Sequence, residues 1–117
     1  MKKLTQIATI TTLSLILSNS LVASDLVEYG DKVFNTKKLG NCLACHDVNG
    51  KKINSPGSLG PKLSGLKYWD EKTLYDTVYD IYKSRGIKNS AMPPFGTNGW
   101  LSDKQITAVV AYLKTID

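Results

Sequence analysis

Residues 40–46 read GNCLACH, and this stretch holds both cysteines and the single histidine of a 117-residue chain. Two cysteines separated by two residues, with a histidine directly after the second, form the attachment motif of a c-type haem. The spacing lets two thiols on one helical turn add to the two vinyl groups of a porphyrin, while the imidazole points at the iron. The motif predicts one covalent haem c, with Cys42 and Cys45 as thioether anchors and His46 as the proximal iron ligand.

Other uses of a close cysteine pair fit this sequence less well. A thioredoxin-like dithiol belongs to a βαβ unit, whereas the chain has no run of alternating strand character. A structural zinc site needs four nitrogen or sulfur ligands, and the chain has two cysteines and one histidine. A disulfide between the two cysteines would close a very short loop, and such a loop stabilises a fold little. Haem attachment is therefore the favoured interpretation.

The second axial ligand is predicted by elimination, because the chain has no second histidine and both cysteines are used by the haem. Met92 lies in the loop sequence AMPPFG, where Pro93 and Pro94 restrict the backbone. Ligation by histidine and methionine raises the reduction potential and closes the iron to substrates, which favours one-electron transfer over oxygen or peroxide chemistry. Ligation by lysine or tyrosine, or an open sixth site, are the alternatives.

A further residue is predicted to act on His46 through the ring nitrogen that faces away from the iron. A ligating imidazole usually donates its other N–H to an acceptor, which fixes the ring and raises its basicity. The carbonyl of Pro61, in the sequence GPKLSG, is the candidate acceptor. The alternative is that Gly60 and Pro61 simply form a turn.

The N-terminal segment predicts export. Residues 1–23 begin with MKK, continue with an apolar stretch at 7–17 and end in small residues, which is the layout of a secretory signal peptide. The apolar stretch is shorter and richer in hydroxyl groups than the ~20 apolar residues of a spanning helix. We therefore expect cleavage after Ala23 or Ser24, a periplasmic domain at 24–117 and no stable membrane anchor.

The charge pattern indicates a protein partner. The formal net charge is +5, and cleavage would remove two of these charges with the first lysines. The remaining domain is mildly basic and has no long basic run, which suits docking onto an acidic protein face and excludes nucleic acid as the expected partner.

Helical periodicity predicts an all-α domain with helices near 25–36, 70–85 and from Ser102 onward. The segments 47–68 and 86–100 are rich in glycine and proline and predict loops. Such long loops are unusual in a compact domain unless they wrap a large rigid ligand.

The first and last helices are expected to pack closely against each other. Gly30 gives the first helix a bare patch, which indicates that another backbone approaches there. Phe34, Tyr112 and Leu113 are the expected core contacts between these two helices.

The ordered motifs GNCLACH, GPKLSG and AMPPFG, followed by a final helix with VVAYL, resemble the class I cytochrome c family across 25–117. The resemblance implies helices wrapped around one covalent haem, with the N- and C-terminal helices crossing. It gives Cys42, Cys45, His46 and Met92 their roles as attachment and iron-ligating residues, and it gives the Pro61 carbonyl its contact with the histidine.

A narrower resemblance is to SoxX, the monohaem subunit of the SoxAX sulfur-oxidation complex. It rests on GSLGPKLSG at 57–65 and MPPFGTNGWLS at 92–102. It implies a SoxA-like subunit as partner, a SoxYZ-like carrier and a downstream cytochrome. In such an L-cysteine S-thiosulfotransferase complex, thiosulfate is coupled oxidatively to a cysteine of the carrier. No residue here resembles the partner's catalytic cysteine, so this chain is expected to accept the electron without catalysing the sulfur chemistry alone.

Two other functions stay open from the sequence. One is a free diffusible cytochrome that delivers electrons to a terminal oxidase. The other is a haem-based ligand sensor in which the iron is not closed by Met92.

Overall fold

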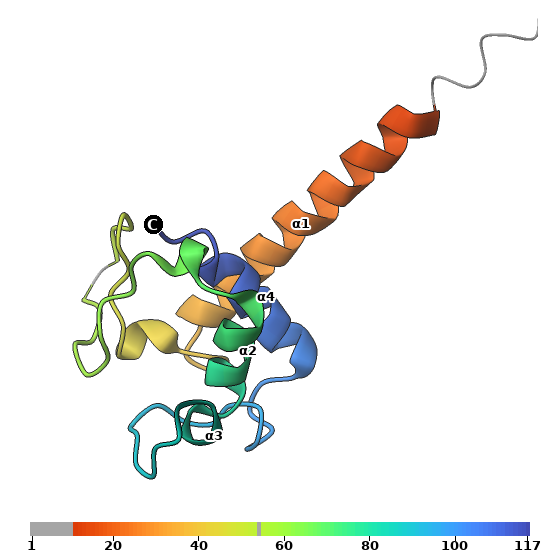
Figure 1. The fold of residues 1–117 in the computed structure, drawn as a ribbon. Helices are drawn as coiled ribbons and strands as arrows, with labels where there is room; N and C mark the ends of the chain where they lie inside the picture. The colour runs from red at the N-terminus through yellow and green to blue at the C-terminus, as the bar shows by residue number, and fades with distance from the viewer. Residues whose placement is uncertain (1–10, 54) are drawn as a thin grey trace, which may run out of the picture.

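The computed structural model describes residues 11–53 and 55–117 as a helical domain (Figure 1). Its elements are α1 (Thr11–Asn35), η1 (Cys42–Ala44), η2 (Leu66–Tyr68), α2 (Glu71–Tyr79), α3 (Ile81–Arg85) and α4 (Asp103–Leu113). The described residues contain no strand, and an isolated parallel bridge joins Val48 to Leu63. The predicted all-α class is confirmed.

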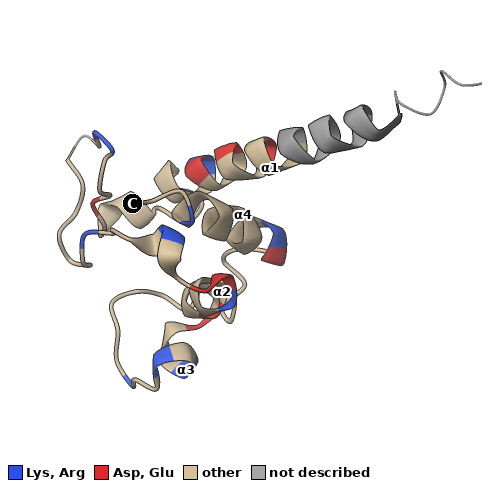
Figure 2. Ribbon diagram, turned by 45° about the horizontal axis from the view of Figure 1, so that its top comes forward, with Lys and Arg blue, Asp and Glu red and all other residues tan. Residues whose placement is uncertain are grey.

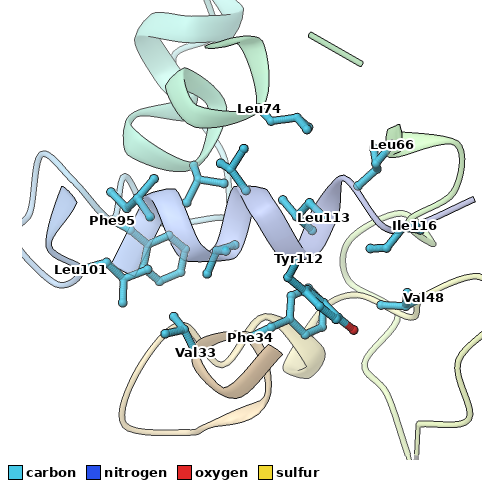
Figure 3. Packing of buried hydrophobic residues seen from close by; sticks show 14 residues of the cluster. Val33, Phe34, Val48, Leu66, Leu74, Phe95, Leu101, Tyr112, Leu113 and Ile116 are labelled. Atoms are coloured by element: carbon cyan, nitrogen blue, oxygen red, sulfur yellow. The ribbon is translucent and has the colours of Figure 1, made fainter. Parts of the chain in front are cut away.

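Helices α1 and α4 cross where a glycine removes the side chain between them. A Cβ atom on Gly30 would lie 1.9 Å from the carbonyl oxygen of Ala108 in α4, so the two backbones are in direct contact. One turn further along, the rings of Phe34 and Tyr112 pack with their centroids 5.2 Å apart (Figure 3). The predicted close packing of the first and last helices is therefore confirmed.

The core joins this helix pair to the rest of the chain (Figure 3). Leu74 and Val78 add the inner face of α2, and Leu66 and Ile116 close the core near the C-terminal end. Burial of apolar side chains of this size contributes about 1.5–3 kcal/mol each. We call these buried residues the core cluster: Val33, Phe34, Val48, Leu66, Leu74, Val78, Phe95, Leu101, Ile106, Val109, Val110, Tyr112, Leu113 and Ile116.

The first helix begins earlier than the sequence pattern predicted, at Thr11 rather than near residue 25. No glycine or proline occurs between Thr11 and Tyr29, so nothing in the backbone interrupts the helix there. The expected cleavage position falls within it, and residues 1–10, with the basic start of the predicted signal peptide, lie outside the described residues. Among the described helices, none has the length and apolar character needed to cross a membrane.

The single helix predicted over residues 70–85 was wrong, because two helices occupy this range. Asp80 lies between α2 and α3 and has an extended conformation, with φ −155° and ψ 94°. Its side chain caps α3 by accepting a hydrogen bond from the amide of Lys83 at 3.1 Å. A local side-chain contact therefore replaces the helical hydrogen bond at this position.

The other helix ends follow the expected capping chemistry. Asp70 caps α2 by accepting from the Thr73 amide at 2.9 Å. Ser102 and Gln105 form a reciprocal capping box at the start of α4. Gly86 ends α3 with a left-handed φ of 61°, a conformation that glycine adopts readily.

Candidate haem-binding site

The two cysteines lie on one tight turn. Cys42 begins η1, and its carbonyl accepts hydrogen bonds from the amides of Cys45 at 3.1 Å and His46 at 2.9 Å. The amide of Gly40 donates to the Val33 carbonyl at 3.0 Å, which ties this turn to the end of α1. The two cysteines are not joined in a disulfide, so the turn places two separate sulfur atoms directly before the imidazole.

The environment of Cys42 argues against a redox-active dithiol. Burial raises the pKa of the Cys42 thiol to about 12, and the neighbouring Cys45 adds to this effect. Reactive cysteines in disulfide oxidoreductases instead have a lowered pKa, because the thiolate is the nucleophile. Burial therefore disfavours the thiolate form of Cys42 at neutral pH.

The predicted hydrogen bond between His46 and Pro61 is present. The Nδ1 atom of the imidazole lies 2.7 Å from the Pro61 carbonyl oxygen, and because a carbonyl only accepts, Nδ1 carries the proton. This contact fixes the tautomer and the ring orientation and leaves Nε2 free to bind a metal.

A chain segment after the cysteines, which we call the proximal loop (residues 47–65), runs back along η1 and His46. The amide of Gly57 donates to the Leu43 carbonyl at 2.9 Å, and the amide of Gly60 donates to the Cys45 carbonyl at 2.8 Å. The amide of Leu63 then reaches the Asp47 carbonyl at 2.8 Å. Residues 57–63 are thus held by backbone hydrogen bonds along the turn that carries the histidine.

Two glycines permit this close approach. A Cβ atom on Gly57 would lie 1.6 Å from the Ala44 carbonyl oxygen, and one on Gly60 would lie 2.4 Å from Cε1 of His46. The glycine content of this segment predicted only a loop, and these two contacts were not predicted. The sequence carries no signal for these contacts, because a glycine in a loop does not show which backbone approaches it.

Met92 comes from a separate loop between α3 and α4, residues 86–100, which we call the Met92 loop. The Met92 side chain is half-buried and packs, like Cys42, against the core cluster. Its amide donates to the Ser90 hydroxyl at 3.1 Å. In Figure 1 the cysteine turn (yellow) and the Met92 loop (cyan) both lie at the end of the molecule away from the start of α1.

The donor set fits a haem better than a bare ion. Within residues 11–53 and 55–117, no three His, Cys, Asp or Glu side chains are grouped to hold a metal. A porphyrin supplies four nitrogen ligands itself, so it needs from the protein only anchors and axial ligands. Two thiols on one turn, an oriented imidazole and a glycine-lined contact with the histidine ring meet these needs.

Residues 27–117 match the family model described as Cytochrome c. The chain therefore belongs to the cytochrome c family, carries one covalently attached haem c and transfers single electrons.

Two comparisons narrow the relationship. A crystal structure of SoxXA from P. pantotrophus contains a chain with a TM-score of 0.65 and 29% identity, over 75% of this chain and 79% of that chain. The predicted class I fold and the resemblance to SoxX are thereby confirmed. An uncharacterized lipoprotein of Aquifex aeolicus (strain VF5) is 37% identical over 87 residues. The match covers 73% of this chain but 40% of that relative, so this chain spans less than half of its length.

Proposed function

We propose that Cys42 and Cys45 carry the haem as thioethers and that Nε2 of His46 is the proximal ligand. The support is local: the two cysteines lie on one turn without a disulfide between them, and the other imidazole nitrogen, Nδ1, is hydrogen-bonded to the Pro61 carbonyl. Because that carbonyl accepts a hydrogen bond from the Nδ1–H group, it increases the electron donation of the imidazole and stabilises the oxidised iron. Pro61 is therefore a positioning residue for His46.

Met92 is proposed as the sixth ligand. The Met92 side chain is half-buried, and the two prolines that follow it restrict the backbone. Little conformational freedom is therefore lost when the thioether binds the iron. When bound, haem c supplies one-electron redox chemistry, and the methionine excludes oxygen and other small ligands from the iron. The residues of this chain thus hold the ring in place, set its potential and keep its iron closed.

The protein is proposed to be the electron-accepting subunit of a SoxAX-type complex in the periplasm. The observation that carries this assignment is the similarity to a chain of the SoxXA crystal structure over 79% of that chain. In this role it would receive an electron when a SoxA-like partner couples thiosulfate to a SoxYZ-like carrier, and pass it to a downstream cytochrome. The sulfur chemistry would belong to the partner.

The surface beside the proposed haem site suits protein contacts. Leu59, next to the glycine that touches His46, is 72% exposed. Exposed lysines 51, 52 and 62 lie on the same proximal loop, and acidic residues lie on α1 and α2 (Figure 2). An apolar contact suits the uncharged core of an interface, and a polar, solvent-accessible rim surrounds such a core.

Co-purification tests the assignment. The chain, matured in the periplasm, is isolated with a SoxA-like subunit, and gel filtration with mass spectrometry is expected to give a stable heterodimer with one haem mass on this chain. Leu59→Asp should weaken the heterodimer, because it places a charge at an apolar contact. Tyr68→Asp, at a residue that is 79% exposed on η2, is the matched control. A chain that elutes alone under all conditions would instead support a free carrier serving a terminal oxidase.

Export is tested by the mass of the mature protein. Cleavage after Ala23 or Ser24 should yield a chain without the first lysines and with the haem mass added. Retention of residues 1–23 in the periplasmic fraction would overturn the signal-peptide proposal.

A further inference from the structure

The break between α2 and α3 is accounted for neither by the haem motif nor by the helical pattern. Asp80 lies at this break in an extended conformation, and the residue is only 6% exposed. An aspartate is rarely buried unless its carboxylate is paired or hydrogen-bonded. The partners of this carboxylate therefore indicate what the break does.

An exchange of hydrogen bonds at the break frees one carbonyl of α2. In an uninterrupted helix, the amide of Lys83 would donate to the carbonyl of Tyr79, four residues earlier. Here that amide donates to Oδ1 of Asp80 at 3.1 Å. The Tyr79 carbonyl instead accepts from the amides of Gly96 at 2.9 Å and Thr97 at 3.3 Å. The break thus turns a helix carbonyl towards the Met92 loop.

The second carboxylate oxygen of Asp80 reaches the same loop. Its Oδ2 atom accepts a hydrogen bond from the Thr97 hydroxyl at 2.7 Å. This bond, followed by the one from the Lys83 amide, lowers the pKa of Asp80, so the carboxylate is charged at neutral pH. Hydrogen bonds to a charged acceptor are about twice as strong as neutral ones. The Asp80–Thr97 contact is therefore the strongest single side-chain link between the break and the loop.

The backbone of the loop also fits against the end of α2. A Cβ atom on Gly96 would lie 2.1 Å from the ring of Tyr79. A side chain at position 96 would therefore displace that ring or the loop. The tyrosine ring and its carbonyl thus fix the part of the loop that follows Met92.

The part of the loop before Met92 is held by α3. The hydroxyl of Tyr82 donates to the Ser90 carbonyl at 3.1 Å. The hydroxyl of the same serine accepts from the Met92 amide at 3.1 Å. Both sides of Met92 are therefore fixed by residues within four positions of the helix break.

We infer that the α2–α3 break is a clamp that positions Met92 for the iron, with Asp80 and Thr97 as its positioning residues. The inference rests on the proposed ligation by Met92. It explains why a helix is interrupted at the cost of regular hydrogen bonds. The interruption supplies a carbonyl and a carboxylate that face the ligand loop, and it limits how often the thioether leaves the iron.

Thr97→Val in the haem-loaded protein tests the clamp, because it removes the hydroxyl and keeps the side-chain shape. We expect the variant to bind imidazole in the ferric state and CO in the ferrous state about tenfold better than the wild type. Loss of one hydrogen bond to a charged group shifts such an equilibrium by roughly this factor. Thr97→Ser, which keeps the hydroxyl, should restore wild-type ligand binding.

Thr77→Val is the matched control. The Thr77 hydroxyl is part-buried in α2 and bonds the Thr73 carbonyl and the Ser84 hydroxyl, without touching the Met92 loop. Equal binding of imidazole and CO by Thr97→Val and Thr77→Val would overturn the clamp and leave Met92 ligation intact. If the wild type lacks the absorption band of methionine-ligated ferric haem, or Met92→Ala retains it, ligation fails and the clamp fails with it.

Discussion

The two sides of the proposed haem site are held in different ways. On the histidine side, the proximal loop lies along the cysteine turn through backbone contacts, such as the bond from the Gly60 amide to the Cys45 carbonyl at 2.8 Å. On the methionine side, the loop is attached to a helix break through side chains, such as the bond from Thr97 to Asp80 at 2.7 Å. On the histidine side, the loop that contacts His46 follows it directly in the sequence. On the methionine side, the Met92 loop is held by α2 and α3, which precede it.

This difference indicates where the protein is adjustable. Backbone hydrogen bonds survive most substitutions, so the histidine contact is insensitive to side-chain change except where a glycine is required. Side-chain hydrogen bonds are lost with a single substitution. Ligand exchange and changes in potential are therefore expected to arise on the methionine side, and structural failure on the histidine side.

The largest effect is expected from Gly60→Ala. Its Cβ atom would lie 2.4 Å from the imidazole of His46, so either the ring or the proximal loop must move. Overpacking of this kind costs about 1–3 kcal/mol. The visible spectrum of the haem-loaded variant should show loss of the normal histidine ligation, and thermal unfolding should occur at a lower temperature.

Gly50→Ala is the control for this prediction. Gly50 has a positive φ of 73° and nothing within 4 Å of an added Cβ, so the substitution carries a backbone cost of about 1 kcal/mol without steric contact. Its spectrum should match the wild type. If the two variants share one spectrum, the contact between Gly60 and the imidazole is not what orients the histidine.

The next largest effect is expected from Met92→Ala. The haem should stay attached through its thioethers, while the potential falls by a sizeable fraction of the ~0.8 V range that axial ligands span. The iron should open and bind CO rapidly. Potentiometry and CO binding measure these changes, and a potential equal to the wild type would show that another residue closes the iron.

The histidine side could be predicted from sequence because its determinants are adjacent along the chain. The GNCLACH motif identifies the haem anchors, and the proline carbonyl fifteen residues beyond His46 follows from the chemistry of a ligating imidazole. The close fit of Gly57 and Gly60 could not be predicted, because a glycine in a loop does not reveal which backbone approaches it.

The methionine side was only half predictable. The proline-rich sequence around Met92 indicated a ligand loop, but Leu74, Val78 and Ile81 continue one helical stripe through Asp80 and hide the break. The contact that explains the break joins Asp80 to a threonine 17 residues later. Long-range side-chain contacts of this kind leave no local pattern in the sequence.

A smaller effect is expected from Pro61→Ala. The contact with His46 uses the backbone carbonyl, so alanine retains the acceptor and loses only the restriction on φ. The free energy of unfolding should fall by about 0.4–1 kcal/mol, with the potential nearly unchanged. Chemical denaturation and potentiometry check this pair of results. A large drop in potential would mean that the proline ring itself sets the position of the carbonyl.

The smallest effect is expected from Asp80→Asn, and it should be present at neutral pH and shrink as the protein is acidified. The pKa of Asp80 is lowered in the folded chain below its ordinary value of 3.8 by Thr97 and the Lys83 amide. A carboxylate of this kind stabilises the fold above pH 3.8 and loses its contribution as the pH falls through the lower folded value. Asp80→Asn should therefore be less stable than the wild type at pH 7, and the difference should shrink in acid. Urea unfolding across this range measures it. A constant difference at all pH values would mean that the charge of Asp80 contributes nothing, and that the methionine side is held by contacts that do not depend on this charge.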